Sequence, residues 1–472
     1  MNQPANRIAV IGGGPGGYEA ALVAAQLGAS VTVIEETGLG GSCVLTDCVP
    51  SKALAATSGL IAGLEGAPNL GIRFGGEASP ASPARRTLLP SHPSIDAVRL
   101  NSRIRDLARA QSVDVRTRLG AEGVRVISGR GRLAGPGQVT VDGRLIEADT
   151  VLIATGARPR ELPLAIPDGE RLLTCRQIYD LTEFPPELIV VGSGVTGAEF
   201  ASAFQALGSQ VTLVSSREHV LPNEDTDAAV VVEDVFRRRG MSVLSRSRAV
   251  SAVRTGDGVE VGLEDGRTVR GSHCLLTVGM IPATDGIGLA EAGVAVDERG
   301  FIRVDRVSRT SAPGVYAAGD CTGVWMLASV AAMQGRIAMW HALGEAVQPL
   351  RVGHVAATIF TDPEIATVGV TQQDIDRGLV EAREVKLPLA TNARAKMDAF
   401  SDGFVKLFAR RNSGIVLGGV VVAPRASELI LGVSLAVEQQ LTVDQIAHTF
   451  AVYPSLSGSI TEAARRLMQP AD

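Results

Sequence analysis

The first part of the chain alternates between short apolar runs and one amphipathic stretch. Residues 7–36 contain the apolar run RIAVI, a glycine-rich turn, the Ala-rich stretch YEAALVAAQLG and a second apolar run, SVTVIEE. Short apolar runs bounded by glycine predict buried strands, and the amphipathic stretch predicts a helix. Residues 187–216 repeat this order with LIVVGSG, TGAEFASAFQALG and QVTLVSS, 180 residues further on. We therefore expect two strand-helix-strand units and two nucleotide-binding domains.

The pattern changes after about residue 350. The segments FVKLFARR and GIVLGGVVVAP predict strands, and helical patterns follow to the end. The expected fold class is α/β, with two Rossmann-like dinucleotide-binding domains followed by a C-terminal α+β domain. Residues 66–95 include a Pro/Ser cluster, which predicts a surface excursion between two helices.

Composition narrows the possible function classes. The 472 residues include 45 Lys and Arg against 50 Asp and Glu, a net charge of −5, and 17 aromatic residues. This balance gives no basic footprint for nucleic acid or an anionic membrane. The start of the chain lacks the pattern of a secretory signal, and the apolar runs are too short to cross a bilayer, so we expect a cytoplasmic protein. Five scattered cysteines do not form a secreted disulfide framework.

The first glycine-rich turn has the spacing GxGxxG. Gly12 allows the tight turn, Gly14 lets the backbone approach a pyrophosphate, and Gly17 lets helix and strand pack closely. Glu35 ends the next predicted strand, where its carboxylate can accept a hydrogen bond from a ribose hydroxyl. A turn without a ligand is the alternative, but strand, helix and terminal acid together favour a dinucleotide site.

The second turn repeats the spacing. Its three glycines are Gly192, Gly194 and Gly197. The strand after it ends at Ser215, Ser216 and Arg217, with no acid where the first copy carries Glu35. A carboxylate there would repel a 2′-phosphate, whereas hydroxyls and a nearby Arg tolerate or attract one. We therefore expect the second site to accept NADPH, and NADH as well; a merely solvated turn is the alternative.

Two cysteines lie close together after the first unit. Pro50 suits the first position of a helix, which places Cys48 at the helix N-terminus, where the dipole and unpaired amides should lower the pKa of its thiol. Lys52 adds a positive charge on the same helical face. A crosslink from Cys43 to Cys48 would close too short a loop to stabilise the chain much, so a redox dithiol is the better interpretation. Two unlinked thiols are the alternative.

In this order, the motifs resemble the flavoprotein disulfide reductase family, which includes lipoamide dehydrogenase, glutathione reductase and mercuric reductase. The resemblance runs from about residue 6 to 468 and also rests on VLIATG at 151–156, LTVG at 276–279, GVYAAGD at 314–320, FTDPE at 360–364 and ASELI at 426–430. It implies an FAD-binding domain in two segments, 1–160 and 286–348, an NAD(P)H-binding domain at 161–285 and a dimerisation domain at 349–472. The implied cofactors are FAD, NADPH and NADH, and the implied assembly is a homodimer.

The resemblance also implies site residues. Those for FAD, besides the first turn and Glu35, are Gly41, Ser42, Lys52, Gly131, Thr155, Gly156, Asp320 and Ala328, and Gly279 joins the second turn for NAD(P)H. Asp320 would bond the ribityl chain, the backbone near Ala328 would lie close to the flavin carbonyls, and Gly131 would approach the adenine. Lys52 would pair with Glu199 near the flavin N5, and Cys48 would lie next to the flavin.

One departure from the family pattern bears on the reaction. Disulfide-exchanging members carry His-x-His-Pro near the C-terminus and a Glu five residues after the second His. Here Tyr453 stands at the position of that catalytic His and Gly458 at the position of the Glu. His448 lies five positions before Tyr453, and Glu462 has no imidazole to orient. Since a phenol titrates near a pKa of ~10 and an imidazole near ~6.5, Tyr453 would be a poor base at pH 7.

The same segment is similar to that of actinobacterial-type NAD(P)H:quinone reductases of this family. Quinone reduction needs reduced flavin but no thiol base. We therefore expect hydride to pass from NAD(P)H through FAD, with the Cys43/Cys48 pair as a further store of electrons, to a quinone. A disulfide reductase with an atypical proton donor is one alternative, and a flavin-binding redox sensor or carrier is another. The tail lacks the C-terminal cysteine pair of mercuric reductase.

Overall fold

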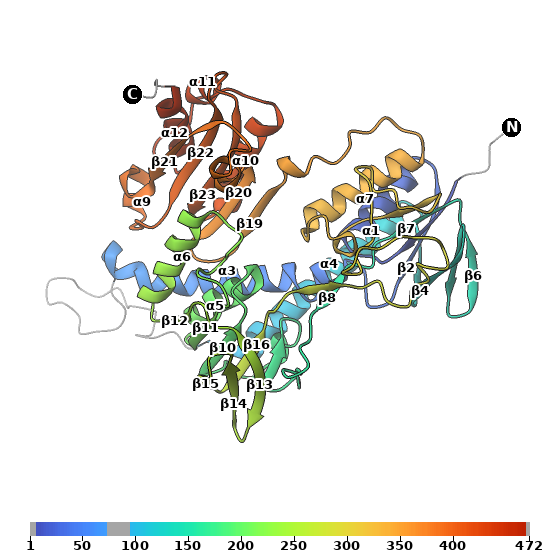
Figure 1. Ribbon diagram of the computed structural model, residues 1–472, viewed down its shortest axis with the longest axis horizontal. Helices are drawn as coiled ribbons and strands as arrows, with labels where there is room; N and C mark the ends of the chain where they lie inside the picture. The colour runs from blue at the N-terminus through green and yellow to red at the C-terminus, as the bar shows by residue number, and fades with distance from the viewer. Residues whose placement is uncertain (1–5, 73–94, 469–472) are drawn as a thin grey trace, which may run out of the picture. The chain divides into compact units, whose positions relative to one another are not determined.

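The protein is described by a computed structural model that covers residues 6–72 and 95–468 (Figure 1). The Pro/Ser cluster of the predicted excursion lies outside the described residues. Contacts divide the chain into two compact units. The first contains the described parts of Met1–Lys52, Ser102–Glu161 and Val278–Val352, and the second those of Ala53–Asn101, Leu162–Thr277 and Gly353–Asp472. The three-domain division with its boundaries stays a prediction.

The first unit is built on a five-stranded parallel sheet in the order β18-β7-β1-β2-β3. Its strands are β1 (Arg7–Ile11), β2 (Ser30–Glu35), β3 (Arg125–Ser128), β7 (Thr150–Ile153) and β18 (Val315–Ala317). The predicted strand, turn, helix and strand at 7–36 are confirmed. Parallel strands buried on both faces need covering layers, and helices and a small second sheet supply them.

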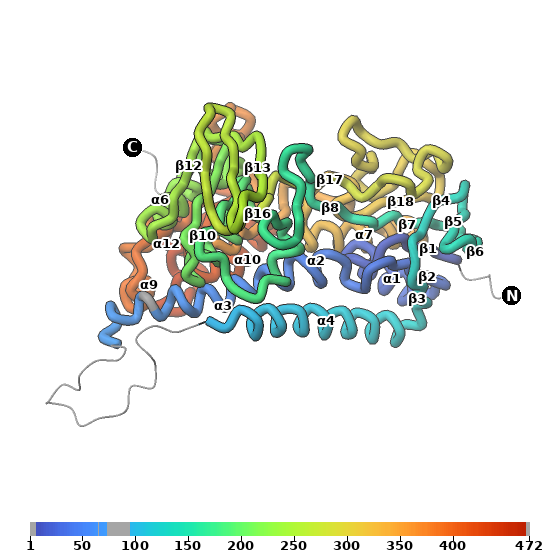
Figure 2. The backbone as a smooth tube through the Cα atoms, turned by 90° about the horizontal axis from the view of Figure 1, so that it is seen from below, coloured from blue at the N-terminus to red at the C-terminus, as the bar shows by residue number. Residues whose placement is uncertain are grey.

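Helices α1 (Pro15–Gln26) and α7 (Ala328–Ala342) lie side by side (Figure 2). A Cβ added at Gly335 would lie 2.1 Å from the carbonyl oxygen of Gly16, so the two backbones approach closely. Small residues of α1, including Ala20 and Ala24, are fully buried against the sheet. The Ala-rich composition of α1 is therefore a packing requirement.

The remaining elements of the first unit are short strands and helices. The exception is the long helix α4, whose residues up to Asn101 belong to the second unit. The antiparallel sheet β4-β5-β6 consists of β4 (Gly131–Gly135), β5 (Gln138–Val141) and β6 (Arg144–Glu147). The strands β8 (Ala157–Pro159) and β17 (Met280–Pro282) pair with each other. The helices are α2 (Gly41–Leu45), the start of α3 (Cys48–Gly66) and most of α4 (Ala97–Ala121).

The second unit contains another five-stranded parallel sheet, in the order β12-β11-β10-β16-β9. Its strands are β9 (Leu172–Thr174), β10 (Glu187–Val191), β11 (Gln210–Val214), β12 (Ser242–Leu244) and β16 (His273–Leu276). With it go α5 (Val195–Ala206), α6 (Thr226–Arg238) and the antiparallel strands β13 (Ala249–Thr255), β14 (Gly258–Leu263) and β15 (Thr268–Gly271). The repeat predicted at 187–216 is confirmed as β10, α5 and β11.

The same unit holds an antiparallel sheet in the order β19-β20-β23-β22-β21. The strands are β19 (Ala356–Ile359), β20 (Glu364–Gly369), β21 (Ala382–Pro388), β22 (Phe404–Arg410) and β23 (Val416–Ala423). The helices of this part are α8 (Gln372–Asp376), α9 (Ala393–Met397), α10 (Ala426–Glu438), α11 (Val443–Ala447) and α12 (Gly458–Met468). Apolar faces of α10 and α12 and the sheet form one core, so the predicted α+β segment is confirmed.

A buried ion pair joins the two sheets of the second unit through α6. Lys406 on β22 is only 2% exposed, and its Nζ lies 2.8 Å from Asp225 Oδ2 and 2.5 Å from Asp227 Oδ2. Asp225 is also the N-cap of α6 and accepts a hydrogen bond from the amide of Ala228. Because a buried charge without a partner is costly, these groups hold each other in place.

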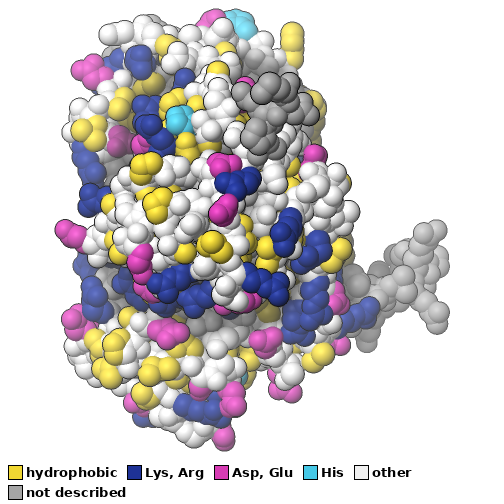
Figure 3. All heavy atoms as spheres, turned by 90° about the vertical axis from the view of Figure 1, so that its right-hand side faces the viewer, with side chains coloured by type: hydrophobic (Ala, Val, Ile, Leu, Met, Phe, Trp, Pro, Cys, Tyr) yellow, Lys and Arg dark blue, Asp and Glu magenta, His cyan; other side chains and the backbone are white. Residues whose placement is uncertain are grey.

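On the face drawn in Figure 3, Lys and Arg side chains form a band, and Asp and Glu side chains lie among and beside them. Several exposed arginines of the first unit are paired, as Arg7 is with Glu147 and Asp149. Within residues 6–72 and 95–468, none of the helices has both the length and the apolar character that a membrane span requires.

Candidate active site

The first glycine-rich turn joins β1 to α1 in a conformation that only glycine permits. Gly12 has a φ of +105°, and a Cβ there would lie 2.2 Å from the carbonyl oxygen of Ala154. A Cβ at Gly17 would lie 1.9 Å from the oxygen of Gly12, and one at Gly41 would lie 2.9 Å from the Cα of Gly14. The backbone therefore forms a cradle without side chains at the N-terminus of α1, which suits a pyrophosphate.

Glu35 ends β2 beside this cradle, as the sequence predicts. Its Oε2 accepts a hydrogen bond from the Gly13 amide at 2.6 Å, and its Oε1 accepts from the amides of Thr37 and Gly38. A carboxylate offers about four acceptor positions. One lone pair of Oε2 is left to accept a ribose hydroxyl, and this role stays a prediction.

The other residues expected to bind FAD lie around the same sheet. Thr155 and Gly156 follow β7, Gly131 begins β4 against Ile11, and Ala328 begins α7. Asp320 follows β18 in a short 3₁₀ turn, where burial and the nearby Asp47 raise the pKa of its carboxyl to about 6. The cradle, the helix N-terminus and Glu35 fit a dinucleotide such as FAD.

The cysteine pair lies in the same unit. Cys43 belongs to α2, and Cys48 is the first residue of α3, which confirms its predicted place at a helix N-terminus. Pro50 is the third helical residue rather than the first, because the carbonyl of Asp47 already accepts the helical bond from Ser51. Ser42 precedes the pair on α2, and its carbonyl accepts the amide of Asp47 at 2.8 Å.

The two thiols share a hydrogen bond in which Cys48 donates to Cys43. This bond lowers the pKa of Cys43 and raises the pKa of Cys48, which burial raises further. The expectation of a lowered pKa at Cys48 is therefore wrong for the dithiol. The hydrogen bond favours the thiolate of Cys43, which accepts it, and disfavours the thiolate of Cys48, which donates it.

The second glycine-rich turn reproduces the first. Gly194 is the N-cap of α5, and a Cβ at Gly192 would lie 2.3 Å from the carbonyl oxygen of Thr277. A Cβ at Gly197 would lie 1.9 Å from the oxygen of Gly192. Gly279 follows β16 with a φ of +105° and belongs to the first unit. The turn after β10 can therefore approach a pyrophosphate as closely as its counterpart after β1.

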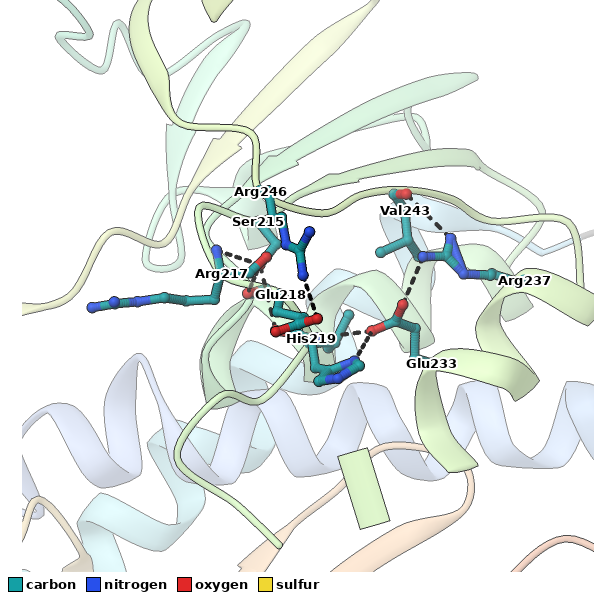
Figure 4. A network of polar contacts seen from close by, with 10 residues as sticks. Ser215, Arg217, Glu218, His219, Glu233, Arg237, Val243 and Arg246 are labelled. Atoms are coloured by element: carbon teal, nitrogen blue, oxygen red, sulfur yellow. Dashed lines mark hydrogen bonds and ion pairs between the residues drawn. The ribbon is translucent and has the colours of Figure 1, made fainter. Parts of the chain in front are cut away.

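Ser215 takes the position that Glu35 has in the first copy, but its contacts are different. It is fully buried, and its hydroxyl lies 2.7 Å from that of Ser193 and accepts a bond from the Arg217 amide at 3.1 Å. Ser216 and Arg217 are exposed, and the Arg217 guanidinium points away from the network in Figure 4. The hydroxyl of Ser215 therefore closes the turn, and Arg217 is the cation available to a ligand.

Sequence reasoning missed two ion pairs that hold the loop around Arg217, Glu218 with Arg246 and Glu233 with Arg237. The exposed Glu218 forms an ion pair with Arg246, and the Arg246 amide donates to the carbonyl of Arg217 at 2.7 Å (Figure 4). Glu233 accepts from the amide of Val220 at 3.0 Å and from Arg237 at 2.6 Å, which anchors the same loop. No motif links positions 218 and 246, because only the folded loop brings them together.

Glu199 and Lys52, which are expected to pair, belong to different units. Glu199 lies on α5, buried, and its Oε1 accepts a bond from the amide of Phe360 at 2.9 Å. Lys52 lies on α3, one turn after Cys48, and lowers the pKa of Cys43. Each unit is described by itself, so the pairing stays a prediction.

The C-terminal segment lies between α11 and α12. Tyr453 is 84% exposed, and Gly458 begins α12. Glu462 is held by Arg465 and Arg466, which lower the pKa of its carboxyl to about 2. His448 Nδ1 lies 2.8 Å from the carbonyl of Asp444. His448 Nδ1 also lies 3.4 Å from the carboxylate of Asp444 on α11. Among the described residues of this segment, the imidazole therefore pairs with a carboxylate of its own helix, whereas Glu462 pairs with arginines.

Comparison with known proteins assigns the family. Residues 6–335 match the pyridine nucleotide-disulphide oxidoreductases, and residues 355–464 match the dimerisation domain of the same group. The chain belongs to the pyridine nucleotide-disulphide oxidoreductase family. The two predicted Rossmann-like domains and the C-terminal dimerisation domain are those of its fold, and its cofactors are FAD and NAD(P)H.

Several family members are similar over nearly the whole chain. An NAD(P)H dehydrogenase (quinone) from Mycobacterium tuberculosis is 55% identical, with 98% of this chain and 94% of the relative covered. A dihydrolipoyl dehydrogenase from Chlamydia muridarum is 33% identical, with 96% and 95% covered. The crystal structure of LpdA from Mycobacterium tuberculosis superposes with a TM-score of 0.91 at 54% identity, covering 98% of this chain and 100% of that one.

Proposed function

We propose that the protein is an NAD(P)H dehydrogenase that reduces quinones. The observation that carries this proposal is the C-terminal segment, where an exposed Tyr453 and the N-terminal Gly458 of α12 replace the imidazole and carboxylate of the disulfide-exchanging enzymes. Glu462 is committed to two arginines and is ionised far below neutral pH, so it does not orient a base. The similar dehydrogenase from Mycobacterium tuberculosis, which carries quinone in its name, supports the same acceptor.

The residues of the chain supply binding and orientation. The cradle of Gly12, Gly14 and Gly41 would hold the pyrophosphate of FAD, Glu35 the ribose, and Asp320 the ribityl chain. Bound FAD supplies the acceptor for hydride from NAD(P)H and the donor of electrons to the quinone. No proton-transfer base is required at the cysteines for this reaction.

The second turn supports NADPH as well as NADH. Ser215 places no charge at the end of β11, and the Arg217 guanidinium extends from the adjacent position (Figure 4). Arg246 neutralises Glu218, the one acid in this stretch of the loop from 215 to 219. A 2′-phosphate would therefore meet an available cation rather than a carboxylate.

We further propose a homodimer assembled through the C-terminal domain. This domain leaves large apolar side chains exposed, among them Phe450 at 100%, Val452 at 77% and Leu431 at 61%. A dimer interface would cover such side chains, and the match to the dimerisation domain makes a second copy the expected partner. Light scattering on the purified protein should give twice the mass of the 472-residue chain.

Steady-state oxidation of NADPH against a panel of acceptors tests the reaction. The panel contains menadione, benzoquinones, lipoamide, glutathione disulfide and Hg(II), and we expect the quinones to be reduced fastest. Cys43→Ser should leave quinone reduction within a factor of a few of wild type, because it blocks disulfide interchange alone. Disulfide turnover faster than menadione turnover, and lost in Cys43→Ser, would refute the proposal.

A disulfide reductase with an unusual proton donor is the second candidate. The hydrogen-bonded thiols of Cys43 and Cys48 and the 33% identical dihydrolipoyl dehydrogenase favour it. In that case Tyr453→Phe should reduce disulfide turnover by about 10²-fold, the lower range of what a positioned acid-base group contributes. Absence of saturable turnover with every acceptor would instead indicate a flavin-binding sensor or carrier.

A further inference from the structure

The loop between β11 and α6 is held in place by bonds to groups outside it. The amide of Leu221 donates to the carbonyl of Ser193, inside the second glycine-rich turn, at 2.8 Å. The amide of Val220 donates to Glu233 on α6 at 3.0 Å. Leu221 has a φ of +54° and is only 1% exposed. A leucine keeps this strained conformation only where its surroundings hold it, and such residues cluster at functional sites.

A buried cation anchors the far end of this loop. Asp225, the N-cap of α6, accepts two bonds from Lys406 Nζ, at 2.8 Å and 3.1 Å, and both side chains are only 3% exposed. Lys406 lies on β22, in the C-terminal antiparallel sheet. The residue before the N-cap, Glu224, donates its amide to the carbonyl of Leu221 at 3.0 Å. A short bonded segment therefore connects the buried lysine with the second glycine-rich turn.

We propose that Lys406 is a positioning residue for the nicotinamide coenzyme and acts through Asp225. By holding the N-cap of α6, it fixes the loop against the glycine-rich turn, so that the coenzyme meets a turn already in its binding conformation. A site that is ordered before binding loses less free energy when the ligand arrives. The inference rests on the proposed placement of NAD(P)H at this turn. A purely structural role would instead lower stability and leave the coenzyme affinity of the folded protein unchanged.

The variants must separate affinity from stability. Lys406→Met alone leaves Asp225 buried without its cation, which is destabilising. The informative variant is Lys406→Met with Asp225→Asn, because replacing a buried ion pair by uncharged groups is often neutral for stability. Asn is as good an N-cap residue as Asp, and Asp227 keeps its second cation, Lys386, at 2.8 Å. Asp225→Asn alone keeps Lys406 beside Asp227 and serves as the milder second variant.

The test is calorimetric titration of NADP⁺ into the FAD-loaded protein, with urea denaturation of the same samples. The Kd of the double variant should rise by about three- to tenfold, the cost of ordering one or two groups, while its unfolding midpoint stays near that of wild type. Asp225→Asn alone should give an intermediate Kd. In steady state, KM for NADPH should rise to the same extent, and kcat with menadione should stay within about a factor of two.

Arg238→Ala is the matched control. Arg238 ends α6, and its exposed ion pair with Asp402, at 2.7 Å, also joins this helix to the C-terminal part of the chain. It lies at the opposite end of the helix from the loop, so its loss should leave the Kd for NADP⁺ unchanged.

A wild-type Kd in both the double variant and Asp225→Asn would overturn the inference. Arg217→Ala distinguishes this result from a failure of the coenzyme placement. If Arg217→Ala weakens NADP⁺ binding and the double variant does not, the anchoring role alone is refuted. If neither weakens it, the placement at the second turn is refuted as well. Because no electron acceptor enters the titration, the result is independent of whether quinones or disulfides are reduced.

Discussion

Coenzyme choice can be changed by copying the first glycine-rich turn into the second. In the first turn, Glu35 accepts the Gly13 amide at 2.6 Å, and a Cβ at Gly13 would lie only 3.1 Å from that carboxylate oxygen. The second turn has Ser193 and Ser215 at these positions, with their hydroxyls 2.7 Å apart. A carboxylate at 215 therefore needs a glycine at 193, and the informative variant is Ser193→Gly with Ser215→Glu.

The charges near the 2′-phosphate set the expected size of the change in kcat/KM. In the double variant a 2′-phosphate would face a carboxylate at the end of β11 and lose part of its contact with Arg217. A hydrogen bond to a charged group contributes about 1.5–3 kcal/mol, so kcat/KM for NADPH should fall about tenfold to hundredfold relative to NADH. The exposed carboxylate should simultaneously favour the ribose hydroxyls of NADH.

The assay is kcat/KM for each coenzyme with one fixed quinone. Thr268→Glu is the control, since it adds the same charge at an exposed position of β15 in the same unit. Arg217→Ala should lower kcat/KM for NADPH and leave that for NADH nearly unchanged. An unaltered NADPH/NADH ratio in the double variant, or a wild-type preference for NADH above about a hundredfold, would refute the reasoning.

Three further outcomes are expected. Anaerobic titration of the holoenzyme should consume two equivalents of dithionite, which is four electrons per subunit. The Cys48→Ser variant should consume one equivalent. A single equivalent in wild type would mean that the pair of Cys43 and Cys48 is redox-silent. Cys43→Ser should retain menadione reduction within a factor of a few, and Tyr453→Phe should also do so, as steady-state rates will show. Lys406→Ala should lower the free energy of unfolding by about 3–5 kcal/mol, because it leaves Asp225 buried without its cation. Urea denaturation measures this change. A decrease below about 1 kcal/mol, which is the range of a surface ion pair, would contradict the buried-pair interpretation.

The spacing of residues within short segments was enough to predict several turns and strands of this protein. The turns at Gly12 and Gly192, the place of Cys48 at a helix N-terminus and the strands β22 and β23 follow from residues close in sequence, and the structure has them where the pattern predicts. The helix itself starts two residues before the predicted first position at Pro50. Turns, helix starts and strand faces depend on hydrogen bonds and side-chain periods within a few residues. A sequence therefore contains that information directly.

The tertiary structure decided the electrostatics of the site. The Ser193–Ser215 hydroxyl pair spans 22 residues, and Glu218 meets Arg246 over 28. Asp320 comes from a distant strand end to act on the Cys43 thiol, and the hydrogen bond from Cys48 reverses the pKa order that the helix N-terminus alone predicts. Charge interactions depend on distance and burial in the folded chain, which no local pattern specifies. For this reason the sequence determined where the turns and cysteines lie, and only the fold decided which charged and polar groups act on them.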